Sequence, residues 1–68
     1  MNELQTHQQR VVDEKGDIDE RLTKLIAFFD NSVFNGLSAD EQGRMKRQAE
    51  HMTNYSVALG ERIAAFQV

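Results

Sequence analysis

Apolar residues recur at helical spacing along most of this 68-residue chain, and no proline interrupts the pattern. In the first half, the apolar positions are separated by steps of seven, four, three and four residues, which places their side chains on one helical face. These positions are Val11, Ile18, Leu22, Leu25 and Phe29. The spacing predicts a helix over about residues 7–30, opened by a capping box from Thr6 to Gln9.

The second half repeats the pattern after a short break. Its apolar stripe consists of Met45, Met52, Leu59, Ile63 and Phe66. The break, residues 31–38, contains Asn35-Gly36, a turn signal because both residues tolerate positive φ. Ser38 and Glu41 have the spacing of a second capping box, so we predict a helix over about residues 39–66.

A short connector makes two helices antiparallel neighbours, so the expected fold is an all-α helical hairpin forming a single domain over residues 1–68. A chain of this length buries a modest fraction of its surface, and small domains usually need a further source of stability. The chain has no cysteine, which excludes disulfides and thiolate metal sites. We therefore expect the hairpin to assemble into a helical homo-oligomer.

Charge and motifs exclude several kinds of function. The net charge of −3 argues against binding duplex nucleic acid, which requires a basic face. The N-terminus lacks the pattern of a signal peptide, and no apolar run is long enough to span a membrane, so we expect a cytoplasmic protein. The sequence has no phosphate-binding glycine loop, nucleophile elbow or zinc-protease motif. We therefore expect no enzymatic activity, no cofactor and no metal, and His51 is expected to lie on the surface.

Polar residues occupy several positions on the apolar stripes. Gln8 and Lys15 do so in the first helix, and Tyr55 and Arg62 in the second. Antiparallel pairing brings all four to the open end of the hairpin, opposite the connector. Together with their neighbours they form a candidate ligand site of nine residues: His7, Gln8, Arg10, Val11, Glu14, Lys15, Tyr55, Arg62 and Phe66.

This cluster has two interpretations. In the structural one, Lys15 and Arg62 bury their stems and expose their charges, polar seam residues fix the register, and Glu14 pairs with Lys15, Arg62 or Arg10. In the functional one, the cluster binds an anion: arginine and lysine bind phosphate, and Tyr55 or Phe66 stacks on a base.

The segments "HQQRVVDEK" and "YSVALGERIAAF" resemble a family of small tailed-phage proteins named after a gene of a crAss-like phage. The resemblance extends from about Thr6 to Phe66. In architecture and setting, the chain is also similar to the small helical-hairpin phage sponges that capture the cyclic-nucleotide signals of CBASS and Thoeris defence. That second likeness has no shared motif, so it transfers no ligand residues.

The likeness to the sponges implies a phage-encoded, non-enzymatic immune-evasion protein that binds and sequesters a small anionic nucleotide signal in the host cytoplasm. The alternative is a small helical interaction protein that inhibits or regulates a host or phage protein. It would use an exposed patch containing Phe28, Phe34 or Val57. A third possibility, a nucleic-acid accessory protein, is disfavoured by the acidic net charge.

Overall fold

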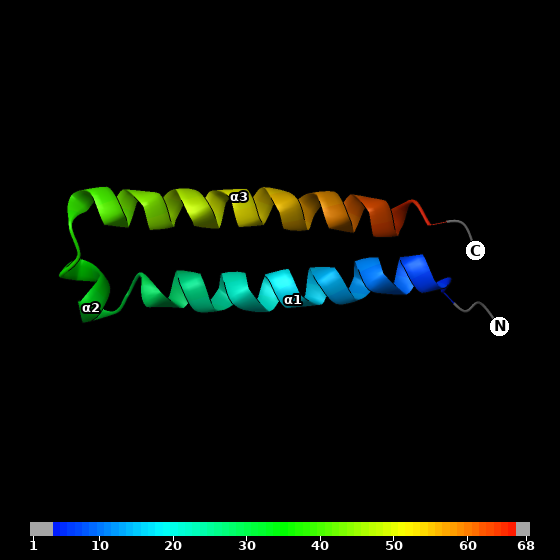
Figure 1. The fold of residues 1–68 in the computed structure, drawn as a ribbon, viewed down its shortest axis with the longest axis horizontal. Helices are drawn as coiled ribbons and strands as arrows, with labels where there is room; N and C mark the ends of the chain where they lie inside the picture. The colour runs from blue at the N-terminus through cyan, green and yellow to red at the C-terminus, as the bar shows by residue number, and fades with distance from the viewer. Residues whose placement is uncertain (1–3, 67–68) are drawn as a thin grey trace.

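The computed structural model describes residues 4–66, which form two long helices and a short one (Figure 1). Helix α1 spans Thr6–Phe28, α2 spans Ser32–Asn35 and α3 spans Ala39–Ala64. Helices α1 and α3 pack against each other in opposite directions, and α2 lies at the end where the chain turns back. The predicted all-α antiparallel hairpin is confirmed.

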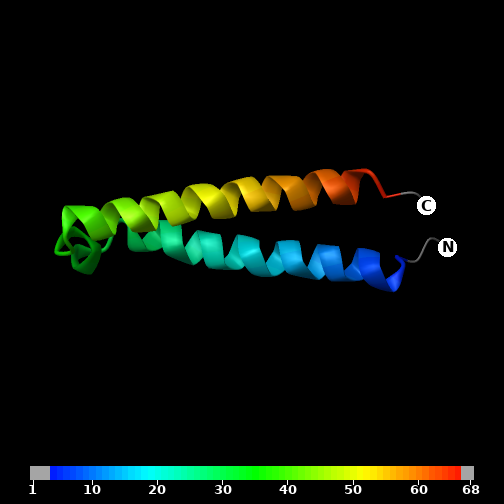
Figure 2. The same ribbon diagram turned by 45° about the horizontal axis from the view of Figure 1, so that its top comes forward.

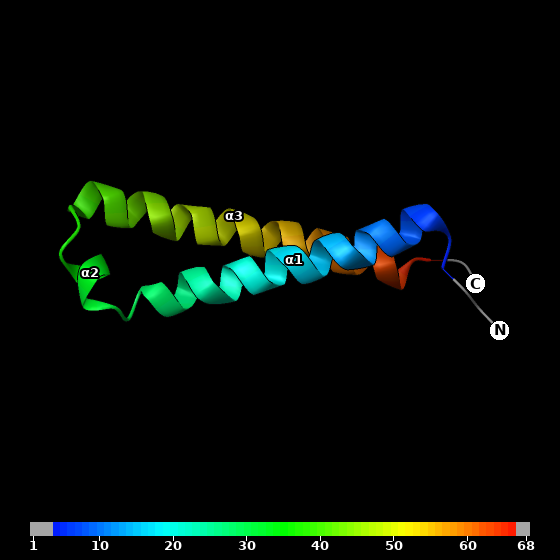
Figure 3. The ribbon, with the colours of Figure 1, turned by 60° about the horizontal axis from the view of Figure 1, so that its bottom comes forward.

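The hairpin is elongated, with extents of 52 × 15 × 14 Å. The helices run side by side when the molecule is turned (Figure 2), and in the view of Figure 3 α1 passes across α3 towards the open end. Within the described residues, neither long helix has an apolar segment of the length and hydropathy needed to cross a membrane.

Side chains at the helix starts satisfy backbone N–H groups that have no partner within the helix. The first helix begins one residue earlier than the predicted capping box: the backbone N–H of Gln5 donates to Oε1 of Gln8 over 2.8 Å. Thr6 is thus already helical, and the capping box predicted for Thr6 and Gln9 is wrong. At α3, the hydroxyl of Ser38 accepts from the N–H of Glu41 over 3.1 Å, which confirms Ser38 as the cap.

The connector contains a helical turn that the sequence pattern did not predict. The side chain of Asn31 accepts from the N–H of Val33 over 2.8 Å and so caps α2. Gly36 ends α2 with φ −83°, and no described residue has positive φ. The break predicted at Asn35-Gly36 is present, because α2 ends at Asn35 and the chain leaves the helix at Gly36, but it forms without the positive φ that these residues tolerate.

Phe34 of α2 closes the turn end of the hairpin. Its side chain is 3% exposed and contacts Phe29, with ring centroids 4.9 Å apart, and Phe28 edge-to-face at 6.0 Å. The ammonium of Lys46 lies 5.9 Å from the centre of the Phe34 ring. The amide of Gln42 donates to the backbone carbonyl of Phe34 over 3.0 Å. The short helix is thus held by aromatic packing and by α3.

Few apolar side chains are fully enclosed by this fold. Among the described residues, those that are buried are Val11, Phe34, Ala49 and Leu59. Phe34 is the largest of the four, so it accounts for a large share of the apolar burial. This core is small for a stable domain.

Replacing Phe34 by Ala is expected to lower the free energy of unfolding by about 3–5 kcal/mol, because it removes a buried aromatic side chain that little else can replace. Val33→Ala is the matched control. Val33 precedes Phe34 in the chain and is 62% exposed, so loss of its side chain should change the free energy of unfolding by less than about 0.5 kcal/mol. Urea unfolding followed by circular dichroism measures both. Equal midpoints for the two variants would contradict this account of the turn.

Candidate functional site

Lys15 is held within the hairpin by two oxygen partners. Its ammonium lies 2.8 Å from Oδ2 of Asp19, one turn along α1, and donates to the hydroxyl of Ser56 on α3 over 2.8 Å. The Ser56 hydroxyl in turn donates to Oδ1 of Asp19. Glu14 does not pair with Lys15, one of the three partners considered for it, because the ammonium pairs with Asp19, four residues on.

Because Gly60 has no side chain, the aliphatic part of Lys15 can occupy the space beside it. A Cβ atom placed on Gly60 would lie 3.3 Å from Cε of Lys15, a tight contact that would require the lysine stem to shift. The ammonium can thereby reach Ser56 on α3, while 31% of the Lys15 side chain stays exposed. Lys15 is a structural residue in this arrangement, and its charge is already paired.

Two other predicted site residues also lie inside the hairpin. Gln8 is buried and caps the start of α1, and Val11 is buried in the core. The remaining predicted residues stay accessible: Phe66 is half-buried, and the exposed ones are His7, Arg10, Glu14, Tyr55 and Arg62. The structure therefore divides the predicted cluster into an interior part and a surface part.

Two of the predicted residues, Tyr55 and Glu14, border a depression in the surface. This depression, of about 210 Å³, joins Tyr55 to Glu14, Ile18 and Arg21 of α1. Tyr55 also forms one end of a larger open groove of about 550 Å³. The groove is the better candidate for a ligand site, because its volume lies in the range of small-molecule sites.

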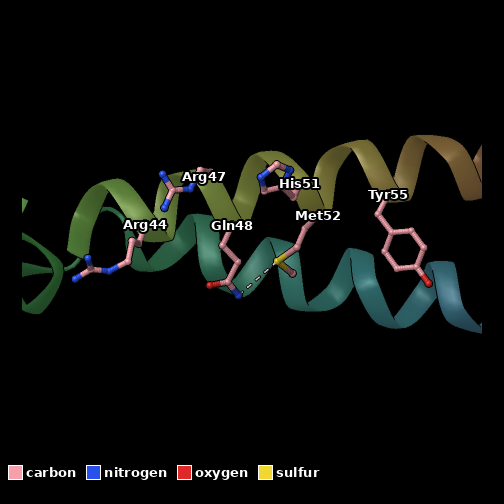
Figure 4. Close-up of a pocket in the computed structure, with 6 residues that line it drawn as sticks. All are labelled: Arg44, Arg47, Gln48, His51, Met52 and Tyr55. Atoms are coloured by element: carbon pink, nitrogen blue, oxygen red, sulfur yellow. Dashed lines mark hydrogen bonds between the residues drawn. The ribbon is translucent and has the colours of Figure 1, made fainter. Parts of the chain in front are cut away.

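All six groove residues come from α3 (Figure 4): Arg44, Arg47, Gln48, His51, Met52 and Tyr55. Their spacing of three, four, seven, eight and eleven residues from Arg44 places them along one side of the helix. Gln48, Met52 and Tyr55 point from α3 towards α1, whereas Arg47 and His51 lie over α3. The groove is about 16 Å long at roughly 1.5 Å per residue.

The groove combines a basic end with an aromatic end. Nε of Arg44 lies 2.8 Å from Oε1 of Glu41, and both side chains are largely exposed. Such exposed ion pairs contribute at most about 1 kcal/mol to stability. An anion that binds the guanidinium more strongly than Glu41 does can therefore replace the glutamate. The amide of Gln48 contacts the sulfur of Met52 at 3.9 Å, a weak interaction that leaves the amide available.

Most of these groove residues lie outside the cluster predicted from the sequence, which shares only Tyr55 with the groove. Arg44 and Arg47 lie outside the apolar seam, His51 was expected to be an ordinary surface residue, and Met52 was assigned to the core. The sequence feature that indicates the groove is the recurrence of cationic and aromatic residues at helical spacing from Arg44 to Tyr55.

The electrostatics of the Lys15 network act on one carboxyl group. The Lys15 ammonium, helped by the Ser56 hydroxyl, lowers the pKa of Asp19 below its usual value of 3.8. Among the described residues, no three side chains of the His, Asp or Glu type gather where they could hold a metal ion.

A comparison with known protein families matches residues 5–65 to the family model described as Sequestin. The matched span is nearly that of the resemblance to small phage proteins described above. No curated protein and no solved structure matches the chain.

The lowered pKa of Asp19 predicts a pH-dependent contribution to stability. A carboxyl whose pKa is lower in the folded than in the unfolded chain stabilises the fold above its unfolded pKa, and the contribution is lost as the pH falls through the folded pKa. We therefore expect Asp19→Asn to lower the urea midpoint at pH 6, and the difference from wild type to shrink below about pH 4.

The matched control is Asp17→Asn, which removes an exposed carboxylate from the same helix and should leave the midpoint nearly unchanged. An Asp19→Asn effect that grows as the pH falls would contradict the sign of this linkage.

Proposed function

The chain belongs to the Sequestin family, and from that membership and the α3 groove we propose that it sequesters a small anionic nucleotide. The family name suggests a sequestering function, which requires binding without chemical conversion of the ligand. In this proposal the protein is not an enzyme. It lowers the free concentration of a defence signal in the cytoplasm of a phage host, so that the signal's effector is not activated.

The observation that carries the proposal is the combination of two arginines and an aromatic side chain along one groove. Arg44 and Arg47 are adjacent on one side of α3, where their guanidinium groups can donate paired hydrogen bonds to phosphate oxygens. Tyr55 lies about 16 Å along α3 from Arg44, and this residue is 42% exposed, so its ring can stack on a base. His51 and Gln48 lie between them and can hydrogen-bond to base or sugar.

The open end of the hairpin is the weaker candidate for the same ligand. It contains the predicted cations Lys15 and Arg62, but Lys15 is bound to Asp19 and Ser56. A phosphate there would have to compete with a carboxylate already 2.8 Å from the ammonium. Arg62 is exposed and remains a useful variant for telling the two sites apart.

The alternative, an interaction protein, has to be revised in its contact residues. Phe34 is buried and Phe28 is half-buried against it, so neither forms the exposed patch that this hypothesis expected. Val57, its third candidate, is 55% exposed, as this hypothesis expected. The apolar side chains most exposed near the turn are Ile26 and Val33, at 50% and 62%. In this alternative, a partner protein would therefore contact the turn end of the hairpin.

Calorimetric titration with a panel of cyclic dinucleotides and ADP-ribose derivatives tests the proposal. We expect at least one to bind with a Kd of about micromolar or below, since capture must be effective at signal concentrations. Arg44→Ala and Arg47→Ala should each weaken that binding about 10-fold or more, because a charge-assisted hydrogen bond contributes about 1.5–3 kcal/mol.

Lys46→Ala is the matched control, because it removes the same charge from the same helix beside the groove residues and should bind as wild type does. Loss of binding in Arg62→Ala, with the two groove variants unaffected, would move the site to the open end. Absence of binding by every nucleotide would count against a nucleotide as the sequestered ligand.

A further inference from the structure

His51 is the groove residue whose charge can follow the pH of the solution. It lies on α3 between the two arginines and Tyr55, with Arg47 near it over the same helix (Figure 4). It is exposed, and it belongs neither to the core nor to the Lys15 network. Histidine is the side chain whose charge ordinarily changes between about pH 5 and 8. The charges around His51 therefore decide how an anion in the groove affects its protonation.

Along α3, the charges on the same side as His51 are positive. Arg47 lies four residues before it, and Arg44, which is paired with Glu41, lies seven residues before it. Residues four apart on a helix have Cβ atoms about 5–6 Å apart, so the Arg47 guanidinium can come close to the imidazole. Glu50 precedes His51 in the chain, but adjacent residues point about 100° apart around a helix, so its carboxylate is directed to another side.

Across the hairpin, the charges of α1 lie beyond the groove. Glu14, Asp17 and Arg21 border the depression of about 210 Å³ that contains Tyr55, one helical turn beyond His51. The groove itself is lined by α3 alone. The charged side chains that share the groove with His51 are therefore the two arginines.

An anion in the groove changes the sign of the electrostatic effect on His51. Two guanidinium groups disfavour a positive charge on the imidazole, because like charges repel. A phosphate held by those guanidinium groups brings an opposite charge to the ring and favours the imidazolium. The bound proton and the bound anion therefore each strengthen the binding of the other, and such coupling is reciprocal.

We propose that His51 contacts a phosphate of the captured ligand as an imidazolium, so that the groove takes up an anion and a proton together. The phosphate site then consists of Arg44, Arg47 and His51, and Gln48 remains for base or sugar. The affinity of the groove for the anion falls as the pH rises, by at most about 10-fold per pH unit for one proton. The coupling rests on the proposed function, because that proposal assigns the anion to this groove.

Proton NMR of the full chain tests the coupling, with inorganic sulfate as the probe because its charge stays constant over the range of a histidine titration. The chain has two histidines, so two Hε1 signals report the two sites, and His7→Gln assigns them. We expect about 50 mM sulfate to raise the titration midpoint of His51 by about 0.5 pH unit or more, relative to chloride at the same ionic strength. An unchanged midpoint would overturn the proposal.

His7 is the internal control for a general salt effect. It is also exposed and lies three residues from an arginine, Arg10, but seven residues from it stands Glu14 instead of a second arginine. Its midpoint should differ between sulfate and chloride by less than about 0.2 pH unit. Equal shifts at both histidines would show that the groove has no part in the effect.

Arg47→Gln tests whether the sulfate that acts on His51 is held in the groove. This variant should lose at least about half of the sulfate-induced shift, because the anion loses one of its two guanidinium partners. Lys46→Gln removes a charge from the neighbouring position outside the groove and should keep the full shift. A full shift in Arg47→Gln would remove the arginines from the site and overturn the proposal.

Calorimetric titration with cyclic dinucleotides and ADP-ribose extends the test to nucleotides, since their phosphodiester and pyrophosphate groups keep their charge near neutral pH. We expect a nucleotide that binds to do so about 5-fold more tightly, or better, at pH 6 than at pH 8. In His51→Gln the two affinities should agree within about 2-fold.

These measurements separate the coupling from the proposed function. A sulfate-dependent midpoint at His51, with no nucleotide bound at either pH, supports the coupling and counts against the proposed ligand. A nucleotide that binds through Arg44 and Arg47 with equal affinity at both pH values supports the proposed function and overturns the coupling.

Discussion

The hydrogen-bonded network of Lys15, Asp19 and Ser56 fixes how α1 lies against α3, and the positions of the other residues follow from it. A slip of one helical turn would remove the ammonium from Ser56 and bring it against a residue with a side chain instead of Gly60. Leaving the partly buried ammonium without these partners would destabilise the slipped register. The polar seam therefore selects one register, which the apolar stripes alone would select weakly.

The small core explains why this selection matters. Apolar packing in the described part of the hairpin depends on four buried side chains, and Phe34 holds the turn end while Leu59 and Val11 hold the open end. Between these ends lie the buried Ala49 and side chains that stay half-exposed, and the polar network adjoins the open end. The two sides of the hairpin differ: one contains satisfied polar groups and the other the groove.

The sequence predicts the fold better than it predicts the site, for a physical reason. Helical periodicity in Val11, Ile18 and Leu22 is a repeated signal, so the hairpin is specified many times over. The caps and α2 depend on single side chains such as Asn31, where a shift of one residue changes the outcome. Asp19 and Ser56 do not lie on the predicted seam, and their meeting with Lys15 depends on rotations that spacing alone does not give. The groove escaped prediction because its arginines lie outside the apolar stripes.

The turn built around α2 also bears on how quickly the chain reaches its folded state. Only about ten residues separate the two long helices, and Phe34 can contact Phe28 and Phe29 as soon as this segment is ordered. Closing so short a loop costs little entropy, and pairing can then proceed from the turn towards the open end. Helical proteins dominated by such near-neighbour contacts fold in microseconds to milliseconds. A hairpin built this way is expected to fold almost as soon as it leaves the ribosome.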